Sequence, residues 1–230
     1  MNLLFFLLQI PNADTTGASE ASTQETTYFD LALQGGWVMV PILILSVVAI
    51  YIFIERYFAI KGASKVDENF MNRIRDYIHD DKIDSALALC QSYQNPVARM
   101  IEKGISRIGR SLQDVNAAIE NVGKLEIYNL EKGLPTLATV AGGAPMIGFL
   151  GTVLGMIRAL IDITAAGENF NITTLSAGIY QAMVTTVAGL IVGIIAYFCY
   201  NYLVARVEKV VNMLEGNATE FMDLLNEPVR

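Results

Sequence analysis

The chain has 230 residues, of which 53% are hydrophobic, and a formal net charge of −7. This composition and the positive mean hydropathy exclude an ordinary soluble domain and favour an integral membrane protein. The long polar stretch 57–132 contains eleven basic and eleven acidic residues, so it offers no basic surface for nucleic acid.

Residues 1–30 are expected to form an external N-terminal segment. Residues 1–10 are apolar but too few to span a bilayer, and they lack the basic start and the clear cleavage site of a secretory signal. They are either a weak interfacial anchor or a degenerate signal, and the sequence leaves both open. Residues 11–27 are rich in Thr, Ser, Ala and acidic residues, which predicts a disordered segment.

Three stretches without a charged residue predict three transmembrane helices in an all-α membrane protein. The uncharged stretches are 31–54, 133–157 and 169–205. The third would cover about 55 Å as a helix, more than a bilayer needs, and its first residues are polar. We therefore predict a periplasmic loop at 164–173 and transmembrane helices at 31–56, 134–163 and 174–205.

The positions of the basic residues predict the orientation of these helices. No Lys or Arg lies in residues 1–55 or between Arg158 and Arg206. The positive-inside rule then places the N-terminus in the periplasm and the C-terminus in the cytoplasm. Cys90 and Cys199 fall on the cytoplasmic, reducing side, so we expect free thiols rather than a disulfide.

The stretches 57–133 and 206–230 are predicted to be helical and to lie in the cytoplasm. Apolar residues recur at helical spacing through the first stretch, with breaks at Asn95-Pro96 and Gly109. The same spacing continues after the third transmembrane helix. We expect these apolar faces to pack on one another as a helical bundle, with contacts between subunits as a second use. The positions are Phe70, Ile74, Tyr77, Ile78, Ala86, Leu87, Leu89, Cys90, Val97, Met100, Ile101, Ile105, Ile108, Val115, Ile119, Val122, Leu125, Leu130, Leu203, Val207, Val210, Leu214, Ala218, Phe221 and Leu225.

The second transmembrane helix has a face of small residues. Gly148, Gly151 and Gly155 lie at the spacing that lets another helix approach closely, and Thr152 lies between them. Its hydroxyl can serve a polar pathway or bond to a carbonyl of its own helix. Arg158 is expected to reach the outer headgroups, or else to guard an external pore mouth, balanced by Asp162 one turn later.

The third transmembrane helix has a comparable face that includes polar residues. Gln181, Thr185, Gly189 and neighbouring small residues recur at three- and four-residue steps, Gly193 follows, and Thr186 flanks them. A glutamine and two threonines are costly against lipid, so they should face protein or water. Two such helices suggest a shared pore or a socket for a partner helix. One copy encloses little of a pore, whereas a ring of copies can.

These two motifs resemble those of the ExbB/TolQ/MotA proton-channel subunits. The similarity is close over residues 140–205, in Gly148-Phe-Leu-Gly-Thr-Val-Leu-Gly-Met and Ser176-Ala-Gly-Ile-Tyr-Gln-Ala-Met-Val-Thr-Thr-Val-Ala-Gly-Leu. Three predicted transmembrane helices fit ExbB and TolQ, whereas the flagellar stator subunit has four. The resemblance implies a homopentamer in the bacterial inner membrane. It surrounds the helices of a single-span partner resembling ExbD or TolR, whose transmembrane aspartate carries the proton.

The resemblance also implies roles for particular residues. Thr152 and Thr186 match the pore threonines of the family, and Thr185 is an additional neighbour. Proton passage would turn the ring and drive an outer-membrane system through a TonB-like protein. One position departs from the pattern, because ExbB and TolQ commonly have glutamate where this chain has Gln181. An amide does not take up or release a proton at ordinary pH, so the coupling at this position is left open.

Other function classes have less support in the sequence. No catalytic set of residues, phosphate-binding loop or metal-ligand cluster is evident, and His79 is expected to be solvated. We therefore expect neither an enzyme nor a cofactor. A TolQ-like role in envelope maintenance and a non-conducting membrane scaffold remain alternatives to an ExbB-like role. The motifs do not separate an ExbB-like role from a TolQ-like role.

Overall fold

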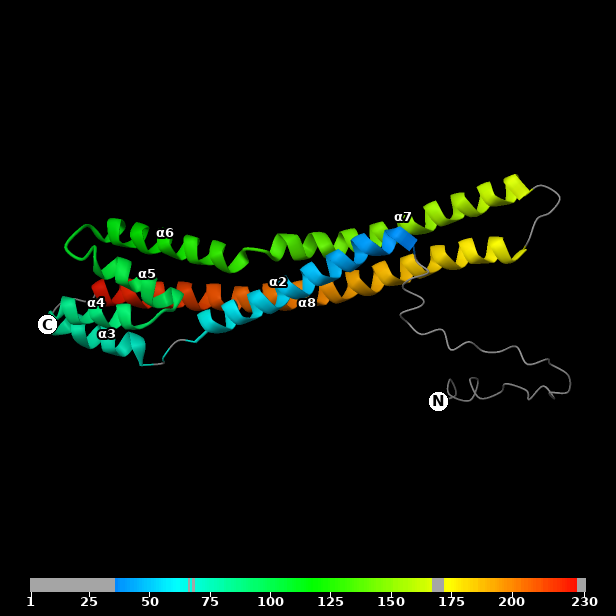
Figure 1. Cartoon of the computed structure of the whole chain (residues 1–230). Helices are drawn as coiled ribbons and strands as arrows, with labels where there is room; N and C mark the ends of the chain where they lie inside the picture. The colour runs from blue at the N-terminus through cyan, green and yellow to red at the C-terminus, as the bar shows by residue number, and fades with distance from the viewer. Residues whose placement is uncertain (1–35, 66, 68, 167–171, 227–230) are drawn as a thin grey trace, which may run out of the picture.

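The computed structural model describes residues 36–65, 67, 69–166 and 172–226. The predicted external segment 1–30 lies outside this part of the chain, as do residues 31–35 of the predicted first transmembrane helix and residues 167–171 of the predicted loop 164–173. Within it every regular element is a helix, in agreement with the predicted all-α fold (Figure 1). The elements are η1 (Gly36–Val38), α2 (Met39–Ala63), α3 (Phe70–His79), α4 (Ile83–Ser92), α5 (Pro96–Ile105), α6 (Leu112–Glu131), α7 (Leu134–Ala166) and α8 (Ile172–Asn226).

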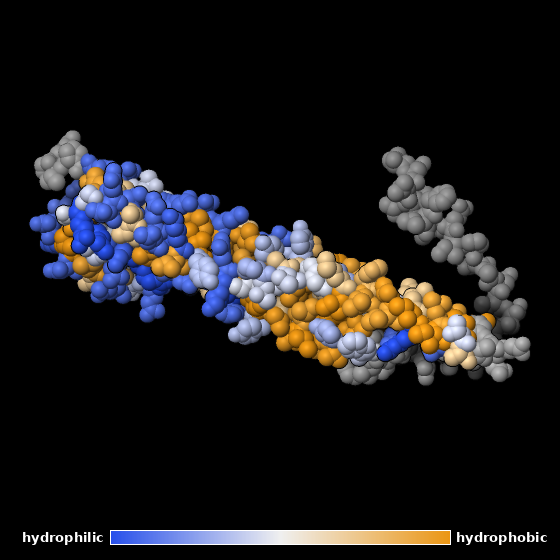
Figure 2. Space-filling view, turned by 90° about the horizontal axis from the view of Figure 1, so that it is seen from above, coloured by the Kyte–Doolittle hydropathy of each residue, from blue (hydrophilic) through white to orange (hydrophobic). Residues whose placement is uncertain are grey.

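Three helical segments of the described chain are long and apolar enough to cross a membrane: α2, the α6–α7 run and α8. The molecule is an elongated rod in which α7 and α8 lie side by side at one end (Figure 1). At the other end α3, α5 and α6 contact α8, and α4 packs on α3 and α5. Figure 2 shows that the first end is predominantly hydrophobic and the second predominantly hydrophilic. The chain is therefore a multi-pass membrane protein, as predicted.

Helix α8 runs through both halves of the rod. Its 55 residues correspond to a length of about 82 Å, and no proline interrupts them. The predicted transmembrane helix 174–205 and most of the predicted tail 206–230 thus form one continuous helix. Helices α6 and α7 are separated by a short break in which Gly133 has φ +87°, a left-handed conformation that glycine adopts without steric cost.

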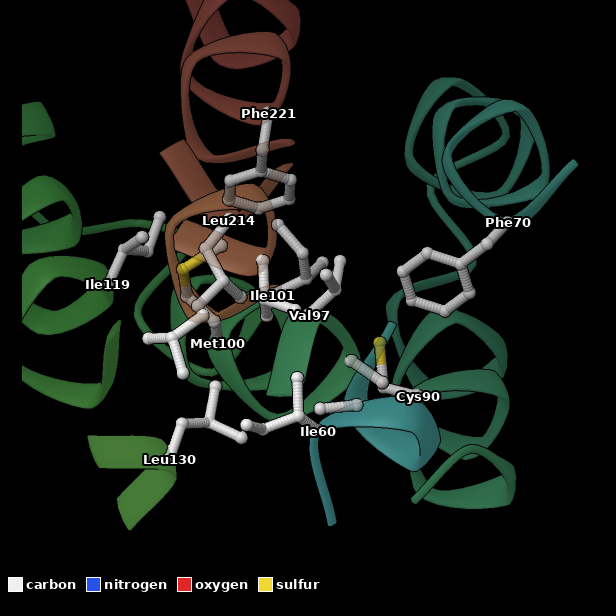
Figure 3. Packing of buried hydrophobic residues seen from close by; sticks show 14 of the residues in the cluster. Ile60, Phe70, Cys90, Val97, Met100, Ile101, Ile119, Leu130, Leu214 and Phe221 are labelled. Atoms are coloured by element: carbon white, nitrogen blue, oxygen red, sulfur yellow. The ribbon is translucent and has the colours of Figure 1, made fainter. Parts of the chain in front are cut away.

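The hydrophilic half has a hydrophobic core built between α8 and the short helices. Phe221 and Leu214 of α8 are buried in the same cluster as Ile101 of α5 and Ile119 of α6 (Figure 3). All these positions belong to the predicted apolar stripes. Two positions of the predicted stripes are exceptions: Ile108 is 36% exposed, and Leu125 is 62% exposed. Leu125 lies six residues from Ile119, about 120° around α6, so it points away from this core and its predicted burial is wrong.

The helix boundaries in this half follow from local sequence. Asn95 and Pro96 begin α5, with Asn95 as the N-cap residue whose side chain accepts a hydrogen bond from the amide of Ala98 at 2.7 Å. Ser111 caps α6 in the same way through Asp114 at 3.2 Å. Such caps satisfy backbone amides that have no partner inside the helix.

Candidate functional site

The transmembrane parts of α7 and α8 pack closely along a stripe of small residues. A Cβ atom added to Gly148 would lie 2.9 Å from the carbonyl oxygen of Thr185, and one added to Gly189 would lie 2.6 Å from that of Ala144. Both separations are shorter than real side chains tolerate, so the two backbones meet here only because these residues are glycines. The predicted packing residues Gly148, Gly151, Gly155, Gly189 and Gly193 are all buried against the opposite helix.

The threonines occupy different environments in this interface. Thr185 is 1% exposed, and its hydroxyl lies against Gly151 and donates to the carbonyl of Ala182 at 2.8 Å. The hydroxyl of Thr186 donates across the interface to the carbonyl of Gly148 at 3.0 Å. Thr186 therefore links the two helices, whereas Thr185 bonds within its own.

Thr152 is half-buried and bonds within α7. Its hydroxyl donates to the carbonyl of Phe149 at 2.6 Å, which is the local hydrogen bond that sequence reasoning offered as one of two uses. A hydroxyl that donates one hydrogen bond retains lone pairs that accept others. Thr152 lies one turn beyond Gly148, the residue to which Thr186 is bonded, so the two threonines lie on the same flank of the helix pair.

Gln181 lies on the opposite flank. It is five residues before Thr186, which places the two side chains about 140° apart around α8. Its amide nitrogen contacts Gly36, which has φ +68° and where a Cβ would collide with this nitrogen. The structure thus brings Gln181 to the start of the first transmembrane helix and does not bring it to Thr186. Sequence reasoning missed this contact, for which the sequence carries no local signal.

Arg158 lies beside Gln181. Both line a cavity of about 110 Å³, together with Trp37, Leu154 and other residues of α7 and η1. Leu154 is two residues from Thr152, so the cavity is about 160° around α7 from that threonine. Arg158 is exposed and makes no ion pair with Asp162, although the two are one turn apart.

The chemistry available on the threonine flank is limited to hydroxyl groups and backbone carbonyls. No carboxylate occurs in residues 134–161 of α7 or 172–207 of α8. Hydroxyls can pass a hydrogen bond to water or to a neighbouring group, but they do not hold a proton charge at ordinary pH. Among the described residues, no group of three or more His, Cys, Asp or Glu could hold a metal ion.

Comparison with known proteins assigns this arrangement to a family. The sequence model of the MotA/TolQ/ExbB proton channel family matches residues 92–216, which is more than half of the chain. A putative biopolymer transport protein ExbB homolog of Methanothermobacter thermautotrophicus is 28% identical over 82% of this chain and 67% of its own length. The Tol-Pal system protein TolQ of Pseudomonas aeruginosa is 27% identical over 84% of this chain and 87% of its own. The matched region contains the small-residue interface and its threonines, and the chain belongs to the MotA/TolQ/ExbB proton channel family.

Proposed function

We propose that this chain is the pore-forming subunit of a proton-driven motor in a bacterial inner membrane, coupled to outer-membrane transport through a TonB-like protein. Family membership supports the coarser part, a proton channel subunit that is not an enzyme. The observation that carries the site assignment is the flank formed by Thr152 and Thr186, where hydroxyls lie on a rigid, closely packed helix pair.

A ring of copies accounts for the large apolar surface around this flank. Phe149, three residues before Thr152, is 66% exposed in a single copy, and Val187, which follows Thr186, is 55% exposed. Several copies around a common axis would cover these side chains and bring the hydroxyls of all copies to one lumen. We propose five copies, as the resemblance to ExbB and TolQ implies.

A second protein must supply the group that carries the proton. The described transmembrane parts of α7 and α8 have no carboxylate near the threonines. A single-span partner resembling ExbD or TolR, with an aspartate in its transmembrane helix, would place one inside the ring. The hydroxyl protons of Thr152 and Thr186 are donated to carbonyls of α7, so their lone pairs would accept hydrogen bonds from the protonated carboxyl group of this partner or from water beside it.

The orientation and the branch of the family belong to this proposal. The basic residues near the helix ends support a periplasmic N-terminus and a cytoplasmic C-terminus. A TolQ-like role is the second candidate, because identity to TolQ of Pseudomonas aeruginosa is 27% and covers 87% of that protein. The identity of the periplasmic protein that co-purifies with the complex, TonB-like or Tol-like, would separate the two.

The first test is native mass spectrometry of the detergent-purified chain co-expressed with a candidate aspartate-bearing single-span partner. We expect a stable complex of five copies with two partner chains. A monomer or dimer that does not bind the partner would contradict the proposed ring of copies and favour a membrane scaffold.

The second test measures proton flux in liposomes that contain the assembled complex. Thr186→Val removes the hydroxyl at nearly constant volume and should reduce flux about tenfold or more, while Thr186→Ser should retain it. Thr164→Val is the matched control, since Thr164 is an exposed residue of α7 that bonds within its own helix. Equal flux in all three variants with assembly intact would overturn the assigned pathway.

A further inference from the structure

An open cavity of about 720 Å³ lies where α2 ends, α5 begins and α6 ends. Its described lining carries four basic side chains, Arg56, Lys65, Arg99 and Lys132, and one acidic side chain, Glu126. The lining therefore has more positive than negative charge, although the stretch 57–132 as a whole is balanced in its acids and bases.

The two arginines are engaged in holding the walls of the cavity together. Arg99 forms a two-pronged pair with Glu126 through its Nε atom, at 2.8 Å, and its Nη2 atom. Arg56 donates to the carbonyl of Asn129 at 2.9 Å and pairs with Glu55. These contacts join α2 and α5 to α6, and they neutralise the only carboxylate of the described lining.

The two lysines are not engaged in this way. Lys65 and Lys132 are exposed, and neither ammonium group forms a hydrogen bond or ion pair with any residue that the structure describes. They follow the last residues of α2 and α6, respectively. The cavity thus presents two unpaired cations on a framework fixed by two arginines.

The cavity also lies at the boundary between the two halves of the molecule. Phe58, one of its lining residues, is 66% exposed, and one turn earlier Ile54 is 50% exposed. This places a hydrophobic helix surface immediately beside the lysines. A ligand that fits both features has an anionic head and an apolar tail.

We propose that this cavity binds the phosphate headgroup of an anionic phospholipid, with Lys65 and Lys132 holding the phosphate and the acyl chains lying along α2. Basic cavities between the ends of membrane helices are suited to such headgroups. Lipid is favoured over free phosphate because the cavity adjoins the exposed apolar surface of α2, along which acyl chains can lie while the headgroup occupies the cavity. The inference is independent of proton conduction.

General attraction between a basic membrane boundary and anionic lipid is the competing explanation, and the chain provides a matched control for it. Lys61 and Arg206 lie at the same boundary but line a different cavity, of about 140 Å³. Their cations lie over the rings of Tyr57 and Tyr202, at 5.7 Å and 5.2 Å from the ring centroids. Replacing both removes the same charge as replacing Lys65 and Lys132.

The experiment compares the assembled wild-type protein with Lys65→Gln/Lys132→Gln and Lys61→Gln/Arg206→Gln. Native mass spectrometry counts the lipids retained after titration with phosphatidylglycerol, with phosphatidylcholine, or with phosphatidylglycerol plus excess inorganic phosphate. We expect wild type and the control pair to prefer phosphatidylglycerol. The Lys65/Lys132 pair should bind its tightest phosphatidylglycerol about thirtyfold more weakly, about fivefold for each charge. The conservative variant Lys65→Arg/Lys132→Arg should retain binding.

Three results would overturn the proposal. Equal weakening in the two glutamine pairs would indicate non-specific attraction to the membrane boundary. Absence of a preference for phosphatidylglycerol over phosphatidylcholine in the wild type would show that the cavity is not a specific site for an anionic headgroup. Displacement of phosphatidylglycerol by millimolar inorganic phosphate would assign the cavity to a soluble anion. Because all four substituted side chains are at the surface, loss of folding does not obscure the comparison.

Discussion

At the scale of single residues, the α7–α8 interface depends on the absence of side chains at particular points. Gly189 and Gly148 lie against backbone atoms of the opposite helix, which cannot rotate away as a flexible side chain can. The interhelical hydrogen bond from Thr186 to Gly148 requires the same close approach. Packing and the candidate polar pathway therefore rest on the same positions.

Gly189→Ala should destabilise the protein by about 1–3 kcal/mol, because the added methyl group overlaps the carbonyl of Ala144 and forces the helices apart. Thermal unfolding of the purified protein in detergent measures the effect. Gly216→Ala, on the same helix, is the control. No heavy atom lies within 4 Å of its Cβ position, and alanine favours a helix over glycine by about 1 kcal/mol. Similar melting temperatures for the two variants would contradict this account of the interface.

Gln181 presents a different residue-scale question, because the structure separates it from Thr186 and places it against Gly36. We predict that Gln181→Glu leaves assembly intact and shifts the pH dependence of proton flux relative to the wild type, since a carboxyl group titrates and an amide does not. Gln181→Met, of similar size and without a titrating group, should keep the wild-type pH profile. Superimposable profiles for Gln181→Glu and wild type would place position 181 outside the pathway.

At the scale of elements, helix boundaries in the hydrophilic half are set by caps that differ in burial. Asn95 is 5% exposed. It accepts from the amide of Ala98 and donates to the carbonyl of Lys65 at 3.3 Å. The cap of α6, Ser111, is exposed. Loss of a buried cap leaves amides without water as a substitute partner, so the two caps should not be equivalent.

Asn95→Ala should cost about 1–2 kcal/mol of stability, and Ser111→Ala about half as much. Asn95→Asp retains an acceptor for Ala98 but loses the donor to the carbonyl of Lys65, so it should recover only part of the loss. Thermal unfolding monitored by circular dichroism compares the three variants. A larger cost for Ser111→Ala than for Asn95→Ala would show that burial of the cap does not decide its contribution.

Much of the element-scale architecture could be predicted, because its causes are local in sequence. Uncharged stretches of sufficient length indicate the transmembrane helices, and Asn95-Pro96 marks a helix start through its own backbone chemistry. The exposure of Leu125 could not be predicted from the sequence. Its spacing fits the apolar pattern of α6, but only the packed bundle shows which side of α6 faces the core. The same holds for Gln181 against Gly36 and for Lys65 and Lys132, which line one cavity, because both depend on how distant helices are arranged.

At the scale of the whole molecule, α8 connects the membrane part to the hydrophilic bundle without a break. Its first half packs on α7, and its second half is buried among α5 and α6 through Leu214 and Phe221. A displacement of α8 in the membrane would therefore be transmitted to the bundle by one continuous rod. This arrangement suits a subunit that moves as a unit, and it ties the position of the bundle to the orientation of the transmembrane helices.

The proposed orientation predicts which ends of the rod a membrane-impermeant maleimide can reach in intact spheroplasts. In a Cys199→Ala background, Thr164→Cys at the outer end of α7 should be labelled at once, and Lys124→Cys in α6 only after permeabilisation; both positions are exposed. Native Cys90 should stay unlabelled throughout, because it is 1% exposed and burial raises the pKa of its thiol to about 12. The reactive thiolate forms only well above neutral pH. The Cys199→Ala parent protein therefore serves as the control that should not be labelled. Labelling of Lys124→Cys before permeabilisation, with Thr164→Cys protected, would reverse the orientation and place the hydrophilic bundle outside the cell.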